Sequence, residues 1–299
     1  MLDCLILIED NLEKYYKENN NPKGIQLILD TLDNENINYK LINYKKIQTN
    51  TKGYIVNNKV YEFPKVIISL IVPQPNDKHY KNIRLEFEKH SQHINPYNQV
   101  ELVKDKFKTL QFIKNEIPDV KTPKTILLNE NTNINQIISF LNLPIIFKPN
   151  KGYKGEEVKL LKTRFDLEDT IKNSPPNKYI LQEAITESFG QDIRIVTAST
   201  EVIYSIKREN NKDFRSNRNQ GGKITIYNPN EYLKELSVKI SEKLKLNYAS
   251  IDFLIKNDEY ILCEVNSFPG LTLPLSQIEK DDFTIYENLK STILKKLIF

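Results

Sequence analysis

The stretch SIDFLIKNDEYILCEVNSFPGL (residues 250–271) has two apolar runs around a polar centre, which predicts a β-hairpin over Asn257-Asp258. Because alternate residues of a strand share a face, Glu264 and Asn266 are expected to lie on one face with Leu262. The opposite face is expected to carry Ile261, Cys263 and Val265. A carboxylate in such a run is costly unless it is paired or binds a metal. The alternatives are a strand end that emerges into solvent and an ion pair with a lysine.

Asp252 on the first strand of this hairpin offers Glu264 a partner. If the loop is odd-numbered and centred on Asp258, Asp252 lies directly opposite Glu264. Neighbouring carboxylates repel each other, and a hard divalent cation relieves that repulsion. The oxygen ligands of Asp252, Glu264 and Asn266 suit Mg²⁺, completed by phosphate oxygens and water. In a different register the two acids never meet, and the metal site is lost.

Composition limits the class of protein. With 39% hydrophobic and 27% charged residues, the 299-residue chain is predicted to be globular. The net charge of +4 is too small to indicate a nucleic-acid partner. No apolar run is long enough to span a membrane, and the start lacks a signal-peptide pattern, so a cytoplasmic protein is expected. Two cysteines, Cys4 and Cys263, make neither a disulfide framework nor a zinc pattern.

The order of predicted elements indicates three units. In residues 1–98, strands alternate with helices, which favours an α/β domain with a parallel sheet. Its elements are expected at 5–8, 22–32, 39–42, 65–72 and 80–90. A second unit, 99–184, is expected to contain helices at 100–115, 134–141 and 166–172 and strands at 121–128, 143–149, 158–161 and 178–185. The third, 185–299, follows a hinge at Ile185. It is expected to contain strands at 192–199 and 202–209, a helix at 230–246, the hairpin and a helix at 285–297.

Cations occur in several segments that are otherwise apolar. They are Lys106, Lys148, Arg194, Lys207, Arg208 and Arg215. Each alone is more often a solvated side chain. Convergence of four or more with an acidic cluster would indicate a triphosphate site held together by Mg²⁺. The segment KGYKGEE (151–157) could cover a phosphate with backbone amides, but it is not a Walker A loop. No GxGxxG follows the first strand, and no Ser-His-Asp or Cys-His set is present.

A family resemblance emerges from the order of several motifs. The segment DFRSN (213–217), the paired glycines 221–222, Asp252 and EVNSFPG (264–270) follow one another as in ATP-grasp enzymes of the RimK type. From about Asn95 onward the chain resembles this family. The resemblance implies an α/β (α+β) ATP-grasp fold, with a pre-ATP-grasp domain (1–98), a central lid domain (99–184) and a C-terminal domain that carries the metal site (185–299).

The resemblance also implies roles for individual residues. The catalytic group would be Arg215, Arg208 and Lys148. The residues that bind ATP would be Lys106, Lys148, Gly152, Gly155, Glu183, Ala184, Asp192, Arg208, Arg215, Ser216 and Asn217. The metal ligands would be Asp252, Glu264 and Asn266, which would hold two Mg²⁺ ions bridged by Glu264, with Mn²⁺ as an alternative.

The implied activity is an ATP-dependent ligase that forms an amide from a carboxylate and an amine through an acyl phosphate. The amine would be an amino acid such as glutamate, and the acceptor an amino acid, peptide or protein. No nucleic-acid or membrane partner is expected, and a homo-oligomer stays open. Two alternatives remain: an ATP-grasp kinase acting on a polyol such as an inositol phosphate, and a non-catalytic ATP-binding module. Phe268 departs from the small residue common in the family at this position, which leaves the acceptor open.

Overall fold

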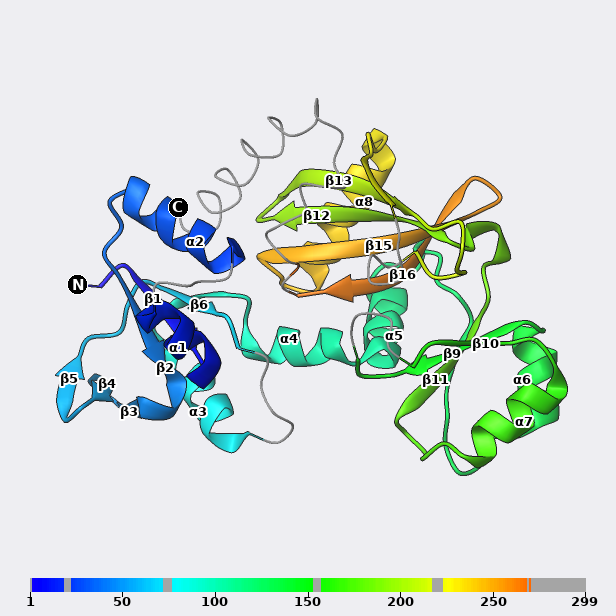
Figure 1. Cartoon of the computed structure of the whole chain (residues 1–299), viewed down its shortest axis with the longest axis horizontal. Coiled ribbons are helices and arrows are strands. Elements are labelled where there is room, and N and C mark those ends of the chain that lie inside the picture. Colours follow the sequence, from blue (N-terminus) through cyan, green and yellow to red (C-terminus); the bar gives the residue numbers. More distant parts are fainter. Residues whose placement is uncertain are drawn as a thin grey trace.

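The computed structural model describes residues 2–18, 23–71, 77–152, 157–216, 223–267 and 269. Within this part of the chain the strands form four sheets, arranged in three blocks (Figure 1). A parallel sheet forms the block at the left of Figure 1, a small antiparallel sheet lies at the lower right, and a five-stranded sheet lies above it. No helix among the described residues is both long and apolar enough to cross a bilayer.

The first block is a parallel sheet with the order β2-β1-β6-β7, as the alternating pattern predicts. Its strands are β1 (Cys4–Ile8), β2 (Tyr39–Asn43), β6 (Val66–Ser69) and β7 (Gln92–Ile94). Its helices are α1 (Asp10–Lys17), α2 (Lys23–Asn34) and α3 (Lys78–Phe87). Both faces of β1 are buried, because every residue of this strand is apolar and packs against a core.

A three-stranded antiparallel sheet in this block was not expected from the sequence. It consists of β3 (Gln48–Asn50), β4 (Gly53–Val56) and β5 (Lys59–Tyr61), preceded by the short helix η1 (Tyr44–Lys46). The turn between β4 and β5 is formed by Asn57 and Asn58, both at positive φ. Asparagine tolerates this conformation better than most residues, which explains the tight connection.

The central block is an antiparallel sheet with the order β10-β9-β11-β8 and two helices on one side. Its strands are β8 (Thr125–Leu127), β9 (Ile145–Pro149), β10 (Lys159–Leu161) and β11 (Tyr179–Glu183). The helices are α6 (Ile134–Leu141) and α7 (Arg164–Lys172). A Thr163–Asp166 capping box begins α7, since each side chain accepts a backbone N–H of the other.

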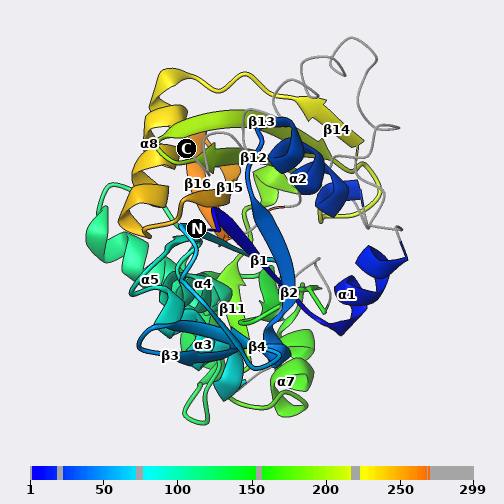
Figure 2. The ribbon, with the colours of Figure 1, turned by 90° about the vertical axis from the view of Figure 1, so that its left-hand side faces the viewer.

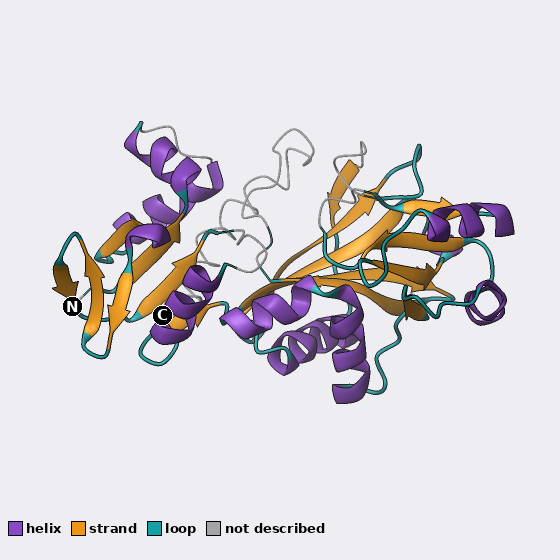
Figure 3. Cartoon of the chain, turned by 90° about the horizontal axis from the view of Figure 1, so that it is seen from below, coloured by secondary structure: helices purple, strands orange, loops and turns teal. Residues whose placement is uncertain are grey.

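The third block is a five-stranded antiparallel sheet with the order β14-β13-β12-β15-β16. Its strands are β12 (Gln191–Ala198), β13 (Glu201–Glu209), β14 (Lys223–Ile226), β15 (Tyr248–Lys256) and β16 (Glu259–Asn266). Helices α4 (Tyr97–Lys104), α5 (Lys106–Glu116) and α8 (Glu231–Lys243) cover one face, where Leu110, Leu236 and Phe253 share a core. The helices appear beneath the strands in Figure 3.

The other face of the five-stranded sheet is divided between two environments. Val196, Tyr204 and Ile206 belong to the same apolar cluster as Ile6 and Ile28 of the first block. Figure 2 shows the first block in front of the large sheet, with α2 beside β13. Farther along the same strands, apolar residues give way to Asp192, Arg194, Arg208 and Asp252. The first block therefore covers half of this face and leaves the polar half open toward the central block.

The predicted single helix at 100–115 is wrong, because the chain breaks into α4 and α5 at Asp105. Asp105 has an extended backbone, and its side chain accepts the N–H of Lys108 as an N-cap (3.0 Å). Asn150, after β9, binds the two N–H groups that precede Lys108. Its backbone oxygen accepts Lys106 N–H, and its side-chain oxygen accepts Phe107 N–H. The break thereby fixes the first residue of α5, Lys106, beside the end of β9.

The helix predicted at 285–297 lies outside the described residues, as do Gly155, Asn217 and Phe268.

Candidate active site

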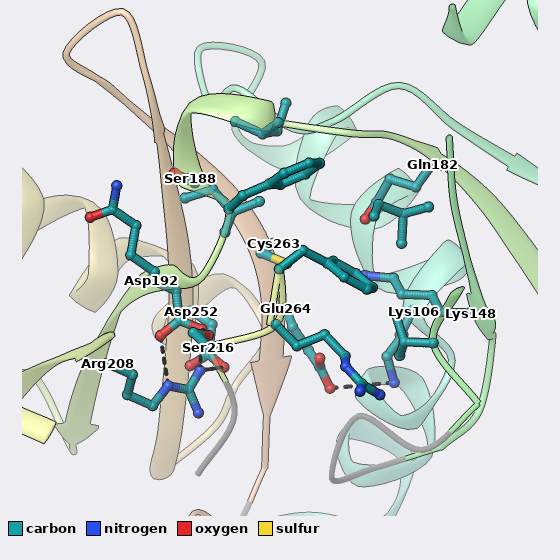
Figure 4. Close-up of a pocket in the computed structure, with 18 of the residues that line it drawn as sticks. Lys106, Lys148, Gln182, Ser188, Asp192, Arg208, Ser216, Asp252, Cys263 and Glu264 are labelled. Atoms are coloured by element: carbon teal, nitrogen blue, oxygen red, sulfur yellow. Dashed lines mark hydrogen bonds and ion pairs between the residues drawn. The ribbon is translucent and has the colours of Figure 1, made fainter. Parts of the chain in front are cut away.

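A cavity lies where the central sheet meets the polar half of the large sheet (Figure 4). Most of the predicted site residues line it. They are Lys106, Lys148, Gly152, Glu183, Asp192, Arg208, Arg215, Ser216, Asp252, Glu264 and Asn266. Ala184 does not line the cavity. Lys207 was expected to converge with the other cations, but it alternates away from Arg208 and pairs with Glu209 (2.7 Å).

The hairpin brings Asp252 opposite Glu264, as predicted, but by a different route. Its loop has two residues, Asn257 and Asp258, both at positive φ, and not an odd number. Regular pairing runs from Lys256 to Phe253, and then the register shifts between Phe253 and Asp252. A β-bulge at Cys263 supplies the extra residue that sets the two carboxylates face to face.

The bulge also corrects the predicted faces of β16. Leu262 was expected to share a face with Glu264, but it is fully buried in the core beneath the sheet together with Val265. Cys263 was expected to pack in the core, yet it lines the cavity with Glu264. Strict alternation fails here because two residues of β16, Cys263 and Glu264, turn to the same face at the bulge.

Asp252 is held by two guanidinium groups. Arg194, on the neighbouring strand β12, donates to both of its oxygens (2.8 and 2.7 Å). Arg208 on β13 donates to Asp252 (2.9 Å) and also pairs with Asp192, whose carboxylate accepts the Ser216 hydroxyl (2.6 Å). Burial acts to raise the pKa of Asp252, but the charges and hydrogen bonds of Arg194 and Arg208 outweigh it and lower the pKa to about 2.

Arg194 is a functional candidate that the site prediction omitted. It lies two residues after Asp192 on β12, so strand periodicity does put both side chains on the cavity face. Its partner could not be found in the same way, because the Arg194–Asp252 pair depends on the register between β12 and β15. Three bonds occupy the Asp252 carboxylate, and its lone pairs leave room for one more ligand.

Two buried lysines face this acidic group from the other side of the cavity, as Figure 4 shows. Lys106 is 9% exposed, and its ammonium group donates to Gly152 O (2.7 Å) and lies 3.3 Å from Glu264 Oε1. Lys148 on β9 is 7% exposed and forms no ion pair with any residue that the structure describes. An ammonium group buried without an acid is costly unless an anionic ligand neutralises it.

The loop that carries Arg215 is attached to the start of β12 through Gly190. Gly190 donates to Phe214 O (2.7 Å) and accepts from Asn210 N–H, with φ at +73°. A Cβ at this position would lie 2.2 Å from Asn210 O, so only glycine fits. Arg215 is oriented by Asp213, which accepts from its Nη2 (2.7 Å) and Nε (3.0 Å). Its guanidinium group therefore sits at the cavity wall in a fixed direction.

The connection between the central block and the large sheet is tied to the tip of the hairpin. Glu183 Oε1 lies 2.6 Å from the ammonium group of Lys256. Burial acts to raise the pKa of Glu183, but Lys256 and the N–H of Lys124 outweigh it and lower the pKa. The short helix η2 (Thr186–Ser188) follows, and Ser188 Oγ bonds both the N–H (2.6 Å) and the carbonyl (2.8 Å) of Ile255.

The donor set fits a hard divalent cation. Asp252, Glu264 and Asn266 supply only oxygen ligands from adjacent strands, and Asp252 is ionised at neutral pH. Among the described residues no group of three or more His, Cys, Asp or Glu side chains forms a metal cluster. A cation here would therefore bind through two carboxylates and an amide, with the remaining ligands from phosphate and water.

Comparison with known proteins identifies relatives of this arrangement. The family model described as "RimK-like ATP-grasp domain" matches residues 103–287. The "Uncharacterized protein MG012" of Mycoplasma genitalium is 32% identical over 194 residues, which are 61% of this chain and 65% of that protein. The "Coenzyme gamma-F420-2:alpha-L-glutamate ligase" of Methanococcus maripaludis is 31% identical over 182 residues, 59% of this chain and 63% of that ligase.

A solved structure shows the same fold over nearly all of this chain. The ATP-grasp ligase PsnB, complexed with minimal precursor, Mg and ADP, has a TM-score of 0.69 at 12% identity, and the match covers 97% of this chain and 98% of PsnB. The mixed α/β architecture is therefore that of ATP-grasp ligases. The matches to the two curated relatives span less than two thirds of those proteins' own length.

Proposed function

Because this chain belongs to the RimK-like ATP-grasp family, we propose that it is an ATP-dependent ligase that joins a carboxylate to an amine. The observation that carries the proposal is Lys148, a buried cation without an acidic partner among the described residues, in the same cavity as the Asp252–Glu264 pair. Such a cavity suits a phosphate chain at the lysines and a divalent cation between that chain and the acids.

The reaction has two steps. A carboxylate oxygen attacks the γ-phosphorus of ATP, and the bond between this phosphorus and the β-γ bridging oxygen breaks. ADP departs, and the carboxylate has become an acyl phosphate. A neutral amine then attacks the acyl carbon, inorganic phosphate departs with the electron pair of the C–O bond, and the nitrogen gives up a proton to form the amide. The first step brings anions together, so fixed cations must stabilise the transition state.

The side chains divide this work between them. Lys106 and Lys148 bind the ATP phosphates, with Gly152 and Gly155 in the covering loop. Arg208 supports the phosphates, Asp192 lies near the nucleotide, and Arg215 stabilises the charge that develops on the transferred phosphoryl group. Glu183 and Ala184 border the adenine, while Ser216 and Asn217 complete the phosphate side. These roles follow the family resemblance, and the shared cavity supports those of its lining residues.

Asp252, Glu264 and Asn266 would hold Mg²⁺, with Mn²⁺ as the alternative. When bound, the ion neutralises phosphate charge; two ions are expected from the resemblance. The chain's own contribution is to keep Asp252 ionised, because Arg194 and Arg208 hold its pKa at about 2. Arg194 and Arg208 also fix the direction of the carboxylate, so that one lone pair remains for the cation.

The proposed amine substrate is an amino acid such as glutamate, because the ligase of Methanococcus maripaludis is named for glutamate. The proposed acid is the carboxylate of a small molecule or of a peptide, since PsnB was solved with a precursor. Two alternatives are less favoured, a kinase acting on a polyol and a non-catalytic ATP-binding module, because the named relatives are ligases.

Hydroxylamine trapping tests the proposal. The chain is incubated with Mg-ATP, hydroxylamine and a matrix of amino acids and short peptides, and ADP and product mass are measured. A ligase yields a hydroxamate in proportion to ADP, because hydroxylamine intercepts the acyl phosphate. A stable phosphate ester without hydroxamate would indicate a kinase, and Mg-ATP binding without ADP release from any mixture would indicate a binding module.

A further inference from the structure

We propose that Asn95 is a positioning residue for the metal ligands of the hairpin, although it lies in the segment after β7 of the first block. The proposal rests on the proposed function, since it concerns the same site. Asn95 is 2% exposed, and its side chain reaches across to Tyr248 of β15 and to Ser267, directly after β16, about 150 and 170 positions away in sequence. It lines no part of the cavity itself.

The carboxamide of Asn95 takes the place of a strand residue at the end of the ladder. Its Nδ2 donates to Tyr248 O (2.6 Å), and its Oδ1 accepts Tyr248 N–H (2.9 Å). A carboxamide offers the same donor and acceptor as a peptide group, so Tyr248 bonds to it as it would to a neighbouring strand. The same Nδ2 also donates to Ser267 O, immediately after β16.

This contact determines where β16 stops. The last pair of the ladder joins Ser250 to Asn266, and Tyr248 is the next residue of β15 whose backbone groups point toward β16. Because Asn95 already satisfies both groups of Tyr248 and binds Ser267 O, the pairing of β16 ends at Asn266. The proposed ligands Asn266 and Glu264 are therefore fixed between the bulge at Cys263 and the carboxamide of Asn95.

Asn95 is in turn held by buried groups of the first block. Arg84 on α3, 2% exposed, donates to Asn95 O, to the Tyr80 hydroxyl (2.7 Å) and to His93 Nδ1 (3.3 Å). A residue this constrained transmits its position to whatever it binds. Displacement of its carboxamide is expected to loosen the end of β16 and the two ligands next to it.

The simplest alternative is that Asn95 only joins two blocks and contributes to stability. Asn247 offers a matched control, because its Nδ2 donates to His93 O (2.8 Å) across the same interface, while its side chain forms no hydrogen bond with the described residues of β16. Asn95→Ala and Asn247→Ala both remove interface hydrogen bonds. Only the first removes a bond to the end of the metal-binding strand.

The experiment measures ATP binding by calorimetry, once with Mg²⁺ and once with EDTA, alongside thermal unfolding. For Asn95→Ala we expect Mg-ATP affinity to fall about 10-fold while metal-free ATP affinity stays within about 2-fold, since the three hydrogen bonds of the carboxamide to Tyr248 and Ser267 are lost. Asn247→Ala should change neither affinity. Equal losses with and without Mg²⁺, an equal effect of Asn247→Ala, or no effect of Asn95→Ala would each overturn the proposal.

If Asn95→Ala does not fold, Asn95→Gln is measured by the same criteria, because it keeps the carboxamide but moves it by one bond. The wild-type chain gives a further readout, since coupling is reciprocal: Mg-ATP should slow hydrogen exchange at the Tyr248 amide more than metal-free ATP does. Equal exchange in both states would overturn the role. A wild type that binds no ATP would instead overturn the proposed function, which distinguishes the two failures.

Discussion

At Lys148 an ammonium group lies beneath the surface, and no described carboxylate neutralises it. Lys148→Met keeps the apolar stem and removes the charge, so ATP affinity should fall about 10- to 100-fold with little loss of stability, as for a charged hydrogen bond. Calorimetric titration with ATP and thermal unfolding measure both. Lys207→Met is the control, because Lys207 pairs with Glu209 outside the cavity. Unchanged ATP affinity in Lys148→Met would contradict phosphate binding by this residue.

Asp252 should make stability depend on pH in the acid range. Its folded-state pKa, about 2, lies below the usual 3.8, so its stabilising contribution is complete above the usual value and is lost as pH falls toward 2. Urea unfolding at pH 5 and pH 2.5 should show a larger loss of unfolding free energy for the wild type than for Asp252→Asn. Identical losses in the two proteins would mean that the Arg194–Asp252–Arg208 group does not stabilise the fold.

The positions of Asp252, Glu264 and Arg194 could be predicted from the sequence only in part. The Asp252–Glu264 pairing was predicted, yet the assumed odd-numbered loop was wrong, and a bulge restored the register. Arg194 could be assigned to the cavity face but not to Asp252, because its strand neighbour is separated from it by more than fifty residues. A single strand reveals its faces; its partners depend on the assembled sheet.

The bulge in β16 leads to a prediction about the element. Deletion of Cys263 would turn the hairpin into a regular ladder in which Asp252 still faces Glu264 and Val265 stays in the core. We expect this variant to fold and to bind Mg-ATP within about 10-fold of the wild type, measured by circular dichroism and calorimetry.

Deletion of Val265 is the control for this variant. Without Val265, Asn266 would move to the core face, and the chain should not fold, because a one-residue slip reverses the faces of a strand. If the Cys263 deletion were also unfolded, the bulge itself, and not the pairing that it allows, would be essential.

The break between α4 and α5 marks the limit of periodicity as a guide to elements. Val103, Leu110 and Ile113 belong to one buried cluster on both sides of the break, so their spacing reads as a continuous helix. The break depends on Asn150, some 45 residues away, which binds the first donors of α5. The spacing of apolar residues within a segment carries no information about such tertiary caps. The bounds of α6 and the position of the hairpin turn depend on local pattern, and both predictions were confirmed.

For the whole molecule, the shared apolar cluster predicts that the first block cannot be removed. A chain of residues 99–299 would expose Val196, Tyr204 and Ile206, and each buried apolar side chain contributes about 1.5–3 kcal/mol. We expect this truncated chain to aggregate, as measured by size-exclusion chromatography against the full chain. A monomeric fragment that unfolds cooperatively would instead show that the proposed boundary at residue 98 separates autonomous domains.

The bulge has a practical consequence for chemistry on this protein. The sequence has two cysteines; Cys4 is completely buried in the first block, whereas Cys263 forms part of the cavity wall. Burial raises the pKa of the Cys263 thiol, so it should resist casual oxidation yet remain the preferred target of a small electrophile at alkaline pH. The bulge therefore places the Cys263 thiol in the cavity wall. The rate at which this thiol is alkylated would report whether a ligand occupies the cavity, without any introduced label.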